Sequence, residues 1–243
     1  MFFAVSHSFA FDKNQVAVTL GRGLFGGHLG VAFHTATEGP KVLHLRFHKD
    51  LQVDPFTNSE HIWIGCVVDL PKIASASLVG ILRGLAKKRP NIGYGLNFIV
   101  GKGSFADNGS YKAPKGSDGF TCSTLITELF RKAALPLIDE TTWQTDPSNL
   151  AWGNAVCCLL EALHPLEIDH LNAVKKNNIG LRIRPEEVAA AADLPFSIRP
   201  VGFAIARQNA QGVFGLLDSV SLLSDPPPHL KHCVEIYEQG QSA

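Results

Sequence analysis

The chain lacks an excess of charge of either sign, because its 22 lysines and arginines balance its 22 aspartates and glutamates. Nucleic acids and anionic membranes attract proteins with a strong positive field, so we expect neither as a partner. The sequence also lacks an apolar run of the roughly 20 residues that a transmembrane helix needs. Its first residues, MFFAVSHSFAFDK, have no basic start and no small-residue cleavage site, so we expect no signal peptide. A cytoplasmic location is the simplest prediction, and export as an effector by a signal-independent route stays open.

Cysteine is scarce and shows no framework spacing. The chain has five cysteines, an odd number without a C-x-x-C pair: Cys66, Cys122, Cys157, Cys158 and Cys233. This argues against a disulfide scaffold and a structural zinc site, and it predicts reduced thiols. The glycine-rich stretch GRGLFGG at 21–27 lacks the lysine and the following helix of a phosphate-binding loop. We therefore predict no cofactor and no metal.

The hydrophobic content, 45% of 243 residues, is enough to bury a sizeable core. Alternating or continuous β-rich runs between glycine- and proline-bearing turns predict antiparallel strands at residues 15–20, 28–34, 42–48 and 61–68. Apolar spacings of three and four predict helices at 71–89, 120–135, 151–163, 166–176 and 185–193. The composition predicts a long loop at 99–119 and a strand at 199–206.

These elements predict an α+β fold in which an antiparallel sheet packs on a helix. We divide the chain into a core at residues 1–140, a helical extension at 141–225 that returns a strand to the core, and a polar tail at 226–243. The tail begins with three prolines, and we expect it to be loosely attached. The sequence indicates no oligomeric state.

Two histidines are predicted to share one face of the sheet. Side chains alternate between the faces of a strand, so each of the segments 28–34 and 42–48 separates its apolar residues from its polar and small ones. If the two strands are neighbours in a hairpin, burying both apolar sets together places His28 and His44 on the opposite, common face. The small residues of the first strand leave space above this face, so that the end of a helix could approach it.

The register of this hairpin decides which histidine lies opposite which. A turn centred near Ala36 places His28 opposite His44, whereas a turn centred near Glu38 places it opposite His48 and leaves His44 diagonal. Either register makes His28 and His44 neighbours. The question of whether His44 or His48 orients His28 stays open at this point.

Cys122 falls in the first turn of the helix expected at 120–135, with Thr121 or Ser123 able to cap it. A helix N-terminus favours a thiolate through its backbone N–H groups and its dipole. A nearby imidazolium lowers the pKa of a thiol further. The sequence therefore predicts a reactive cysteine at this position.

The same residues predict a Cys–His site for nucleophilic catalysis. Cys122 would attack a carbonyl carbon, His28 would act as the base, and His44 would hold His28 in the productive tautomer. The first-turn backbone at Ser123 and the phenol of Tyr94 would donate hydrogen bonds to the developing oxyanion.

Two stretches resemble a known family. HLGVAFHTATEGPKVLHL at 28–45 is similar to the NlpC-type peptidase pattern, in which a catalytic histidine opens one strand and a second polar residue closes the next. TCSTLITELFRKAAL at 121–135 resembles the cysteine helix of that superfamily, and GYGLNF at 93–98 is similar to a segment of its YiiX-like members. The cysteine follows the histidine here, as in the circularly permuted branch of YiiX-like amidases and lecithin retinol acyltransferase-like enzymes. The resemblance covers roughly residues 15–135.

The resemblance implies a permuted papain-like fold with Cys122 as nucleophile, His28 as base and His44 as the third residue. It implies a cysteine hydrolase that cleaves an amide of a peptide or cell-wall fragment through a thioester. A lipid acyltransferase or thioesterase of the same fold is an alternative, which would need an apolar groove instead of polar, peptide-sized walls. An inactive binding protein is a second alternative.

Other histidines have simpler interpretations. The set of His28, His44 and Cys122 could bind zinc, but no general base of a metal enzyme accompanies it. We expect His34 and His48 to be solvated, and the HPLEIDH segment at 164–170 to form a solvated helix surface.

Overall fold

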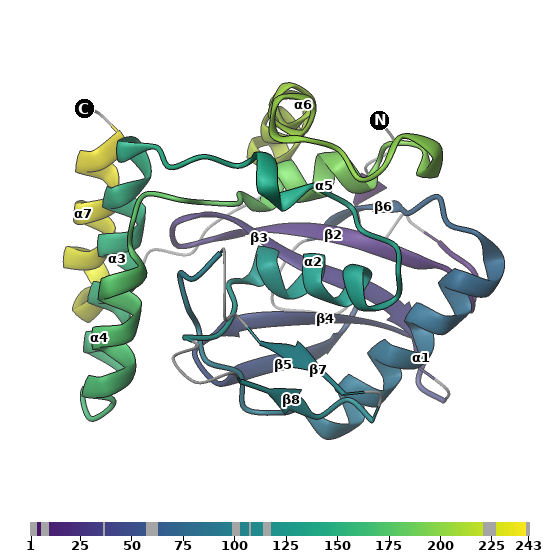
Figure 1. Ribbon diagram of the computed structural model, residues 1–243, viewed down its shortest axis with the longest axis horizontal. Coiled ribbons are helices and arrows are strands. Elements are labelled where there is room, and N and C mark those ends of the chain that lie inside the picture. Colours follow the sequence, from purple (N-terminus) through teal and green to yellow (C-terminus); the bar gives the residue numbers. More distant parts are fainter. Residues whose placement is uncertain are drawn as a thin grey trace.

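The computed structural model describes residues 4–5, 10–35, 37–56, 63–98, 103–106, 108–113, 118–220 and 227–241, and its fold is α+β, as predicted (Figure 1). Six strands form one antiparallel sheet in the order β1-β6-β2-β3-β4-β5. Their bounds are β1 (Ala4–Val5), β2 (Val16–Gly23), β3 (Gly26–His34), β4 (Pro40–Phe47), β5 (Asp50–Pro55) and β6 (Ile64–Val67). Two short strands, β7 (Ser104–Phe105) and β8 (Tyr111–Lys112), pair with each other.

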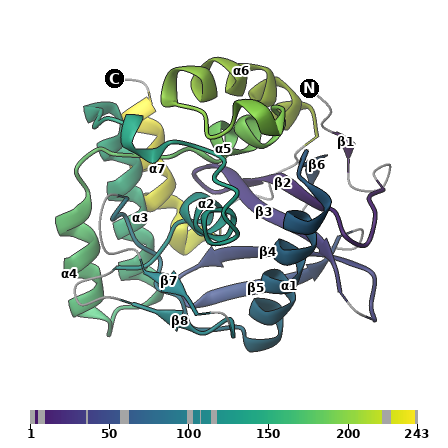
Figure 2. The same cartoon turned by 45° about the vertical axis from the view of Figure 1, so that its right-hand side comes forward.

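The helices of the described residues are α1 (Lys72–Lys88), α2 (Cys122–Lys132), α3 (Leu150–Leu163), α4 (Ile168–Asn177), α5 (Pro185–Ala192), α6 (Phe203–Val220) and α7 (Lys231–Gln241). In both ribbon views α2 lies across the sheet, with α1 toward one end and the group α3, α4 and α7 toward the other (Figures 1 and 2). α5 also packs on β2 and β3. The site described below lies where the first turn of α2 meets the group around α3.

The sheet buries both of its faces, and the main core lies on the face that α2 covers. Alternate residues of β3 (Leu29, Val31 and Phe33) join this core together with the apolar side chains of α2. The opposite face holds a smaller cluster that includes Ala32, Val42 and Trp63. The expectation that a helix approaches over the small residues of β3 is therefore wrong. The rings of His28 and His44 lie 5.9 and 5.2 Å from that of Trp63, on the side of the smaller cluster, whereas α2 and Cys122 lie on the side of Leu29. A Cβ on Gly30 would lie 2.6 Å from Val42, which shows that side chains of neighbouring strands fill this space.

The strand and helix boundaries follow local sequence signals. The helix expected at 71–89 begins after Pro71 and ends at Arg89, whose φ of 41° is left-handed. α5 begins at Pro185, where the missing N–H of proline costs nothing. The strand β5, which the sequence analysis did not predict, pairs with β4 along most of its length.

The C-terminal third differs most from expectation. Residues Phe203–Val220 form helix α6 instead of a strand, and only Val201 makes an isolated bridge, with Ile138. The region expected to be a loose tail contains α7, which packs on α3 and is joined to it by a disulfide between Cys158 and Cys233. The prediction that all five thiols are reduced is therefore wrong for this pair. The two cysteines are 75 residues apart, so no local pattern could have shown the pairing.

The loop expected at 99–119 falls partly on residues 99–102, 107 and 114–117, which lie outside the described residues.

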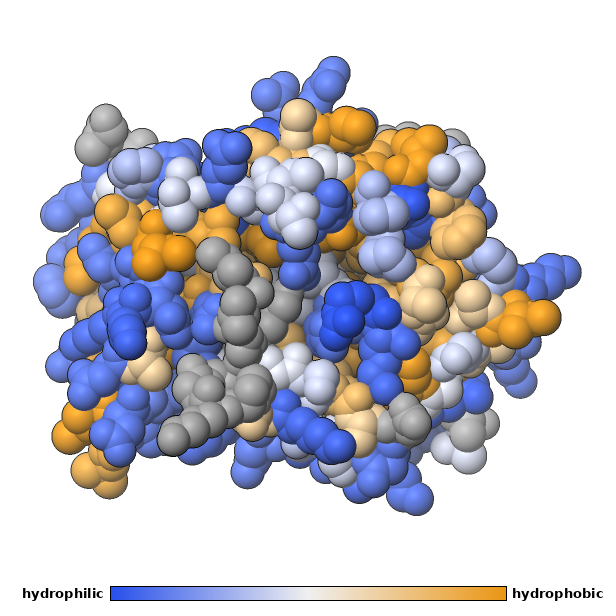
Figure 3. Space-filling view, in the orientation of Figure 1, coloured by the Kyte–Doolittle hydropathy of each residue, from blue (hydrophilic) through white to orange (hydrophobic). Residues whose placement is uncertain are grey.

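Exposed hydrophobic side chains lie in several parts of the surface, and the face shown in Figure 3 carries separate patches, one of them along its upper part. The start of α6 and the segment before it expose Phe196, Ile198, Phe203 and Ile205. In the part of the chain that the structure describes, no helix combines the length and the apolar character that crossing a membrane requires.

Candidate active site

Cys122 is the first residue of α2. The helix begins here because Thr121 and Thr124 form a capping box: the Thr121 hydroxyl accepts the Thr124 N–H at 3.1 Å, and the Thr124 hydroxyl accepts the Thr121 N–H at 2.8 Å. Thr121, not Ser123, is therefore the cap. This start holds Cys122 in the first turn, where backbone N–H groups and the helix dipole favour negative charge.

The phenol of Tyr94 lies beside Cys122 because a glycine-flanked segment docks at the start of α2. The Phe120 N–H donates to the Gly93 carbonyl at 2.9 Å, and the Gly95 N–H donates to the Phe120 carbonyl at 3.1 Å. A Cβ on Gly95 would lie 2.4 Å from the neighbouring backbone, so only glycine allows this approach. Burial raises the pKa of the Tyr94 phenol well above its usual range, although a backbone hydrogen bond with Cys122 lowers it. The phenol therefore keeps its proton.

Burial also dominates the electrostatics of the Cys122 thiol, which is 4% exposed. It raises the pKa of the thiol above its ordinary value, and hydrogen bonds with the Leu29 backbone and the Ser123 hydroxyl lower the pKa by less. The nearby charge of Glu186 raises it again. The position at a helix N-terminus predicts a thiolate, whereas in the structure burial of the thiol outweighs that effect. The resting thiol is protonated at neutral pH and needs a base to become a nucleophile.

His28, His44 and Asp54 form a chain of hydrogen bonds. His28 Nε2 lies 2.8 Å from His44 Nδ1, and His44 Nε2 lies 2.8 Å from Asp54 Oδ2. An ionised carboxylate only accepts, so we assign the proton of His44 to Nε2, and its Nδ1 then accepts from the Nε2–H of His28. With this assignment the proton of the neutral His28 ring is on Nε2.

The strand register explains why these three side chains meet. β3 pairs with β4 with Val31 opposite Leu43, which centres the hairpin on residue 37, midway between the two predicted registers. β4 pairs with β5 with His44 opposite Gln52, so Asp54 is a diagonal neighbour of His44. The residue that bonds to His28 is His44, not His48.

A cavity of about 840 Å³ joins the start of α2, the start of β3 and one side of α3. Four of the predicted site residues line it: Cys122, Ser123, Tyr94 and His28. The fifth, His44, is fully buried and bonds to His28. The remaining polar lining includes Arg46, His48, Lys49, Asp50, Thr121, His164 and Arg182. The apolar lining includes Leu24, Phe25, Phe47, Trp152, Val156, Leu159, Leu163, Ile183 and Leu230.

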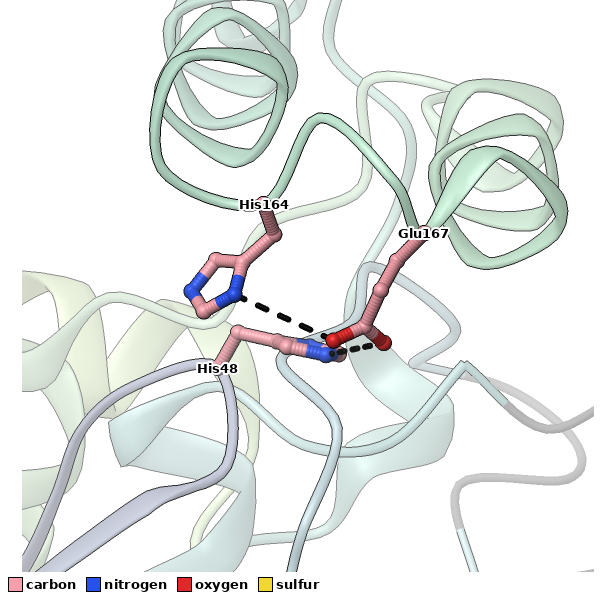
Figure 4. Close-up of side chains that lie close together, drawn as sticks. All are labelled: His48, His164 and Glu167. Carbon is pink, nitrogen blue, oxygen red and sulfur yellow. Dashed lines mark hydrogen bonds and ion pairs between the residues drawn. The ribbon is translucent and has the colours of Figure 1, made fainter.

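A second group of histidines holds the backbone of Tyr94. The Tyr94 N–H donates to His48 Nδ1 at 3.1 Å, and His170 Nε2 donates to the Tyr94 carbonyl at 2.9 Å. The other nitrogen of His48 donates to Glu167 at 2.9 Å, and His164 lies next to both residues (Figure 4). No local pattern marks this group, because its members come from the turn after β4, from the α3–α4 connection and from the start of α4.

The electrostatics of this second group fit a structural role. Burial lowers the pKa of His48 to about 4, and hydrogen bonds from Lys49 and His48 lower the pKa of Glu167 to about 2. His48 is only 3% exposed, so the expectation that it is solvated is wrong. His34 is not simply solvated either, since its Nε2 donates to the Phe11 carbonyl at 2.8 Å.

Among the described residues, His48, His164 and Glu167 are the group whose ligand atoms come within 4.8 Å of one another, as a metal site requires. Their hydrogen bonds do not fit a metal. Because Nδ1 of His48 accepts the Tyr94 N–H, the proton of the neutral ring is on Nε2, and the nitrogen that faces Glu167 cannot bind a cation. The ammonium group of Lys49 already lies 2.5 Å from the Glu167 carboxylate.

Sequence reasoning missed two functional candidates, Asp54 and Arg182. The alternation in DLQVDP at 50–55 was the available signal for β5 and for a carboxylate on the histidine face. No local signal marks Arg182, because its place in the cavity depends on the packing of α3 and α5.

Comparisons of the chain with protein-family models, with curated proteins and with solved structures found no match.

Proposed function

We propose that this protein is a cysteine-dependent acyl-transfer enzyme in which Cys122 is the nucleophile and His28 the general base, with His44 and Asp54 as positioning residues. The observation that carries the proposal is that Cys122 and His28 line one cavity while His28 is connected to a carboxylate through His44. A nucleophile, a base and a group that orients the base are the parts that such catalysis needs.

The protonated thiol defines the first step. Nδ1 of His28 takes the S–H proton as the sulfur of Cys122 attacks the carbonyl carbon, and the carbonyl π electrons move to oxygen. The oxyanion accepts hydrogen bonds from backbone N–H groups at the start of α2 and from the Tyr94 phenol. The tetrahedral intermediate then collapses. The leaving amine, alkoxide or thiolate takes the proton from the His28 imidazolium, and a thioester on Cys122 remains.

Water completes the reaction in the hydrolytic case. Nδ1 of His28 takes a proton from the water as its oxygen attacks the thioester carbon. The second tetrahedral intermediate expels the sulfur, which recovers the proton from His28, and the carboxylic acid leaves. An alcohol or amine in place of water would give acyl transfer by the same steps.

The fold that we propose is the permuted papain-like one. The antiparallel sheet, the cysteine helix packed on β3 and β4, and the order of histidine before cysteine along the chain support it.

The residues that line the cavity indicate which class of substrate it could hold. The amide of a peptide or cell-wall fragment is the first candidate from the resemblance, and the side chains of Lys49, Thr121 and His164 suit a polar substrate. The apolar residues along α3 favour the second candidate, a long-chain acyl ester or thioester. Burying each further methylene of an acyl chain contributes about 0.8 kcal/mol, which corresponds to about fourfold in kcat/KM.

The test of the chemistry is to trap the acyl-enzyme. The protein is mixed with p-nitrophenyl acetate and p-nitrophenyl decanoate, the burst of p-nitrophenolate is recorded, and the acylated residue is located by mass spectrometry. We expect a burst near one equivalent and an acyl group on Cys122. A higher kcat/KM for the decanoate would support the second candidate, and no gain with chain length would support the first.

The matched control uses another buried free thiol, Cys157. Cys157→Ala should keep the burst and the adduct, whereas Cys122→Ala should lose both. An acyl group elsewhere in the chain, or turnover that survives Cys122→Ala, would show that Cys122 is not the nucleophile.

A further inference from the structure

Arg182 is a buried charged side chain on the wall of the Cys122 cavity. It is 5% exposed and lines the cavity between α3 and the start of α5. Its Nη2 donates to the Phe25 carbonyl at 3.0 Å, whereas its Nε and Nη1 atoms have no hydrogen-bond partner among the described residues. Buried donors in proteins are nearly always satisfied, and an unsatisfied one on a charged group is the most costly kind. Both atoms are buried, so an acceptor could reach them only from the cavity that Arg182 lines.

Among the described residues, no carboxylate forms an ion pair with this guanidinium. The nearby acid is Glu186, whose carboxylate accepts the Gly27 N–H at 2.9 Å. Burial raises the pKa of Glu186, and the charge of Arg182 lowers it by less. Glu186 thus interacts with Arg182 through its charge but forms no ion pair with it.

The orientation of the guanidinium is fixed before any ligand binds. Its central carbon lies 4.4 Å from the centroid of the Trp152 ring, in a cation–π contact, and the Phe25 carbonyl holds one edge. A planar guanidinium held in this way presents its remaining N–H groups as a fork, the geometry that carboxylates and phosphates accept. Arg46 lines the same cavity but is paired with Asp50 and is 54% exposed.

We propose that Arg182 binds an anionic group, a carboxylate or a phosphate, on an apolar ligand held in the Cys122 cavity. The ligand has both parts because the arginine lies over Trp152, and α3 lines the cavity with the apolar side chains of Trp152, Val156, Leu159 and Leu163. The inference rests on the proposed function only in taking this ligand to be the substrate or product of Cys122. The binding itself does not require that chemistry.

The experiment measures binding to the Cys122→Ala protein, so that no turnover interferes. Decanoate and decyl phosphate serve as the anionic probes, and decanamide is the neutral probe of the same length. Affinity is measured by calorimetry and by the fluorescence of the protein, which has three tryptophans including Trp152. The same titrations are repeated with Arg182→Met, Arg182→Lys and the matched control Arg46→Met added.

We expect at least one anionic probe to bind about tenfold or more tightly than decanamide. Arg182→Met should remove this preference and leave the affinity for decanamide within about twofold. Arg182→Lys keeps the positive charge but not the planar pair of donors, so it should retain only part of the preference for the anionic probe. Arg46→Met should retain the full preference. Whichever anion is preferred identifies the acid group.

Equal affinity for the anionic and neutral probes, no binding of any probe, or a preference that survives Arg182→Met would overturn the inference. If Arg182→Met does not fold, the Arg182→Lys titration decides, because an unchanged preference there excludes recognition by the fork. An anion preference that depends on Arg182 while Cys122 forms no acyl-enzyme would overturn the proposed function alone.

Discussion

Two histidine groups lie at the same cavity, and they use their nitrogens differently. In the chain His28–His44–Asp54, each hydrogen bond is donated by an imidazole in the direction of the carboxylate. In the group around His48, one ring nitrogen accepts the Tyr94 N–H and the other donates to Glu167. Both nitrogens of His48 therefore make hydrogen bonds that require the neutral form of the ring.

This difference indicates two roles: His28 can carry a proton, whereas His48 acts as a clamp, a side chain that holds the backbone of the Tyr94 segment in place. A general base must gain and lose a proton without losing the contacts that hold it, and the bonds of His28 through His44 persist in both charge states. Protonating His48 would place a second N–H against the Tyr94 N–H and break the bond that holds the segment 93–95. The same residue type therefore moves protons in one place and fixes the backbone in the other.

The largest effect should come from removing the base. His28→Gln should lower the rate of acyl-enzyme formation by about 10²- to 10⁴-fold, because the protonated thiol of Cys122 then has no group to accept its proton. The rate is measured from the burst with p-nitrophenyl acetate between pH 6 and 9. In the variant the rate should rise with pH as hydroxide deprotonates the thiol. A rate within threefold of the wild-type value would mean that His28 is not the base.

The role of His48 as a clamp should be visible in how the free energy of unfolding depends on pH. The pKa of His48 is lowered from 6.5 to about 4, so between these values the unfolded chain binds more protons than the folded one. The contribution of His48 is therefore complete above pH 6.5 and is lost as the pH falls to 4, at a cost of about 3 kcal/mol. The free energy of unfolding in urea, measured across this interval, should fall less in His48→Gln than in the wild type.

The control for this measurement is His232→Gln. The His232 side chain is 78% exposed, so its replacement should leave the pH profile of the wild type unchanged. If the profiles of the wild type and His48→Gln run parallel between pH 4 and 6.5, His48 is not a buried neutral clamp, and the contrast between the two groups disappears.

The parts of the fold with local signals could be predicted from the sequence. Alternation marked β2, β3 and β4, and the spacing of apolar residues marked α1 to α5 close to their observed bounds. The segment 199–206 has β-rich residues, but Phe203–Val220 forms a helix because its apolar side chains, such as Ala206 and Val213, are buried at helical spacing. The disulfide between Cys158 and Cys233 depends on how α7 packs on α3, which no local pattern encodes.

The site was predictable where strand geometry alone decides neighbours. The contact between His28 and His44 follows from alternation and pairing, whichever register the hairpin adopts. The protonation state of Cys122 was not predictable, because the gain from the helix N-terminus is a local property, whereas the larger cost of burial depends on tertiary packing. Asp54 was missed for a related reason, since its role appears only once β5 is paired with β4.

The smallest of the three effects concerns Asp54, and it tests whether the carboxylate distinguishes the first group from the second. Asp54→Asn removes the charge that fixes the Nε2–H tautomer of His44 and stabilises the His28 imidazolium, so we expect acyl-enzyme formation to slow by about tenfold, less than in His28→Gln. The melting temperature should change little, because the Asp54 side chain is 32% exposed. Asp50→Asn is the matched control, since Asp50 begins the same strand and lines the cavity but pairs with Arg46. Equal rates in the two variants would mean that Asp54 only holds β4 and β5 together. The catalytic series of hydrogen bonds from His28 would then end at His44.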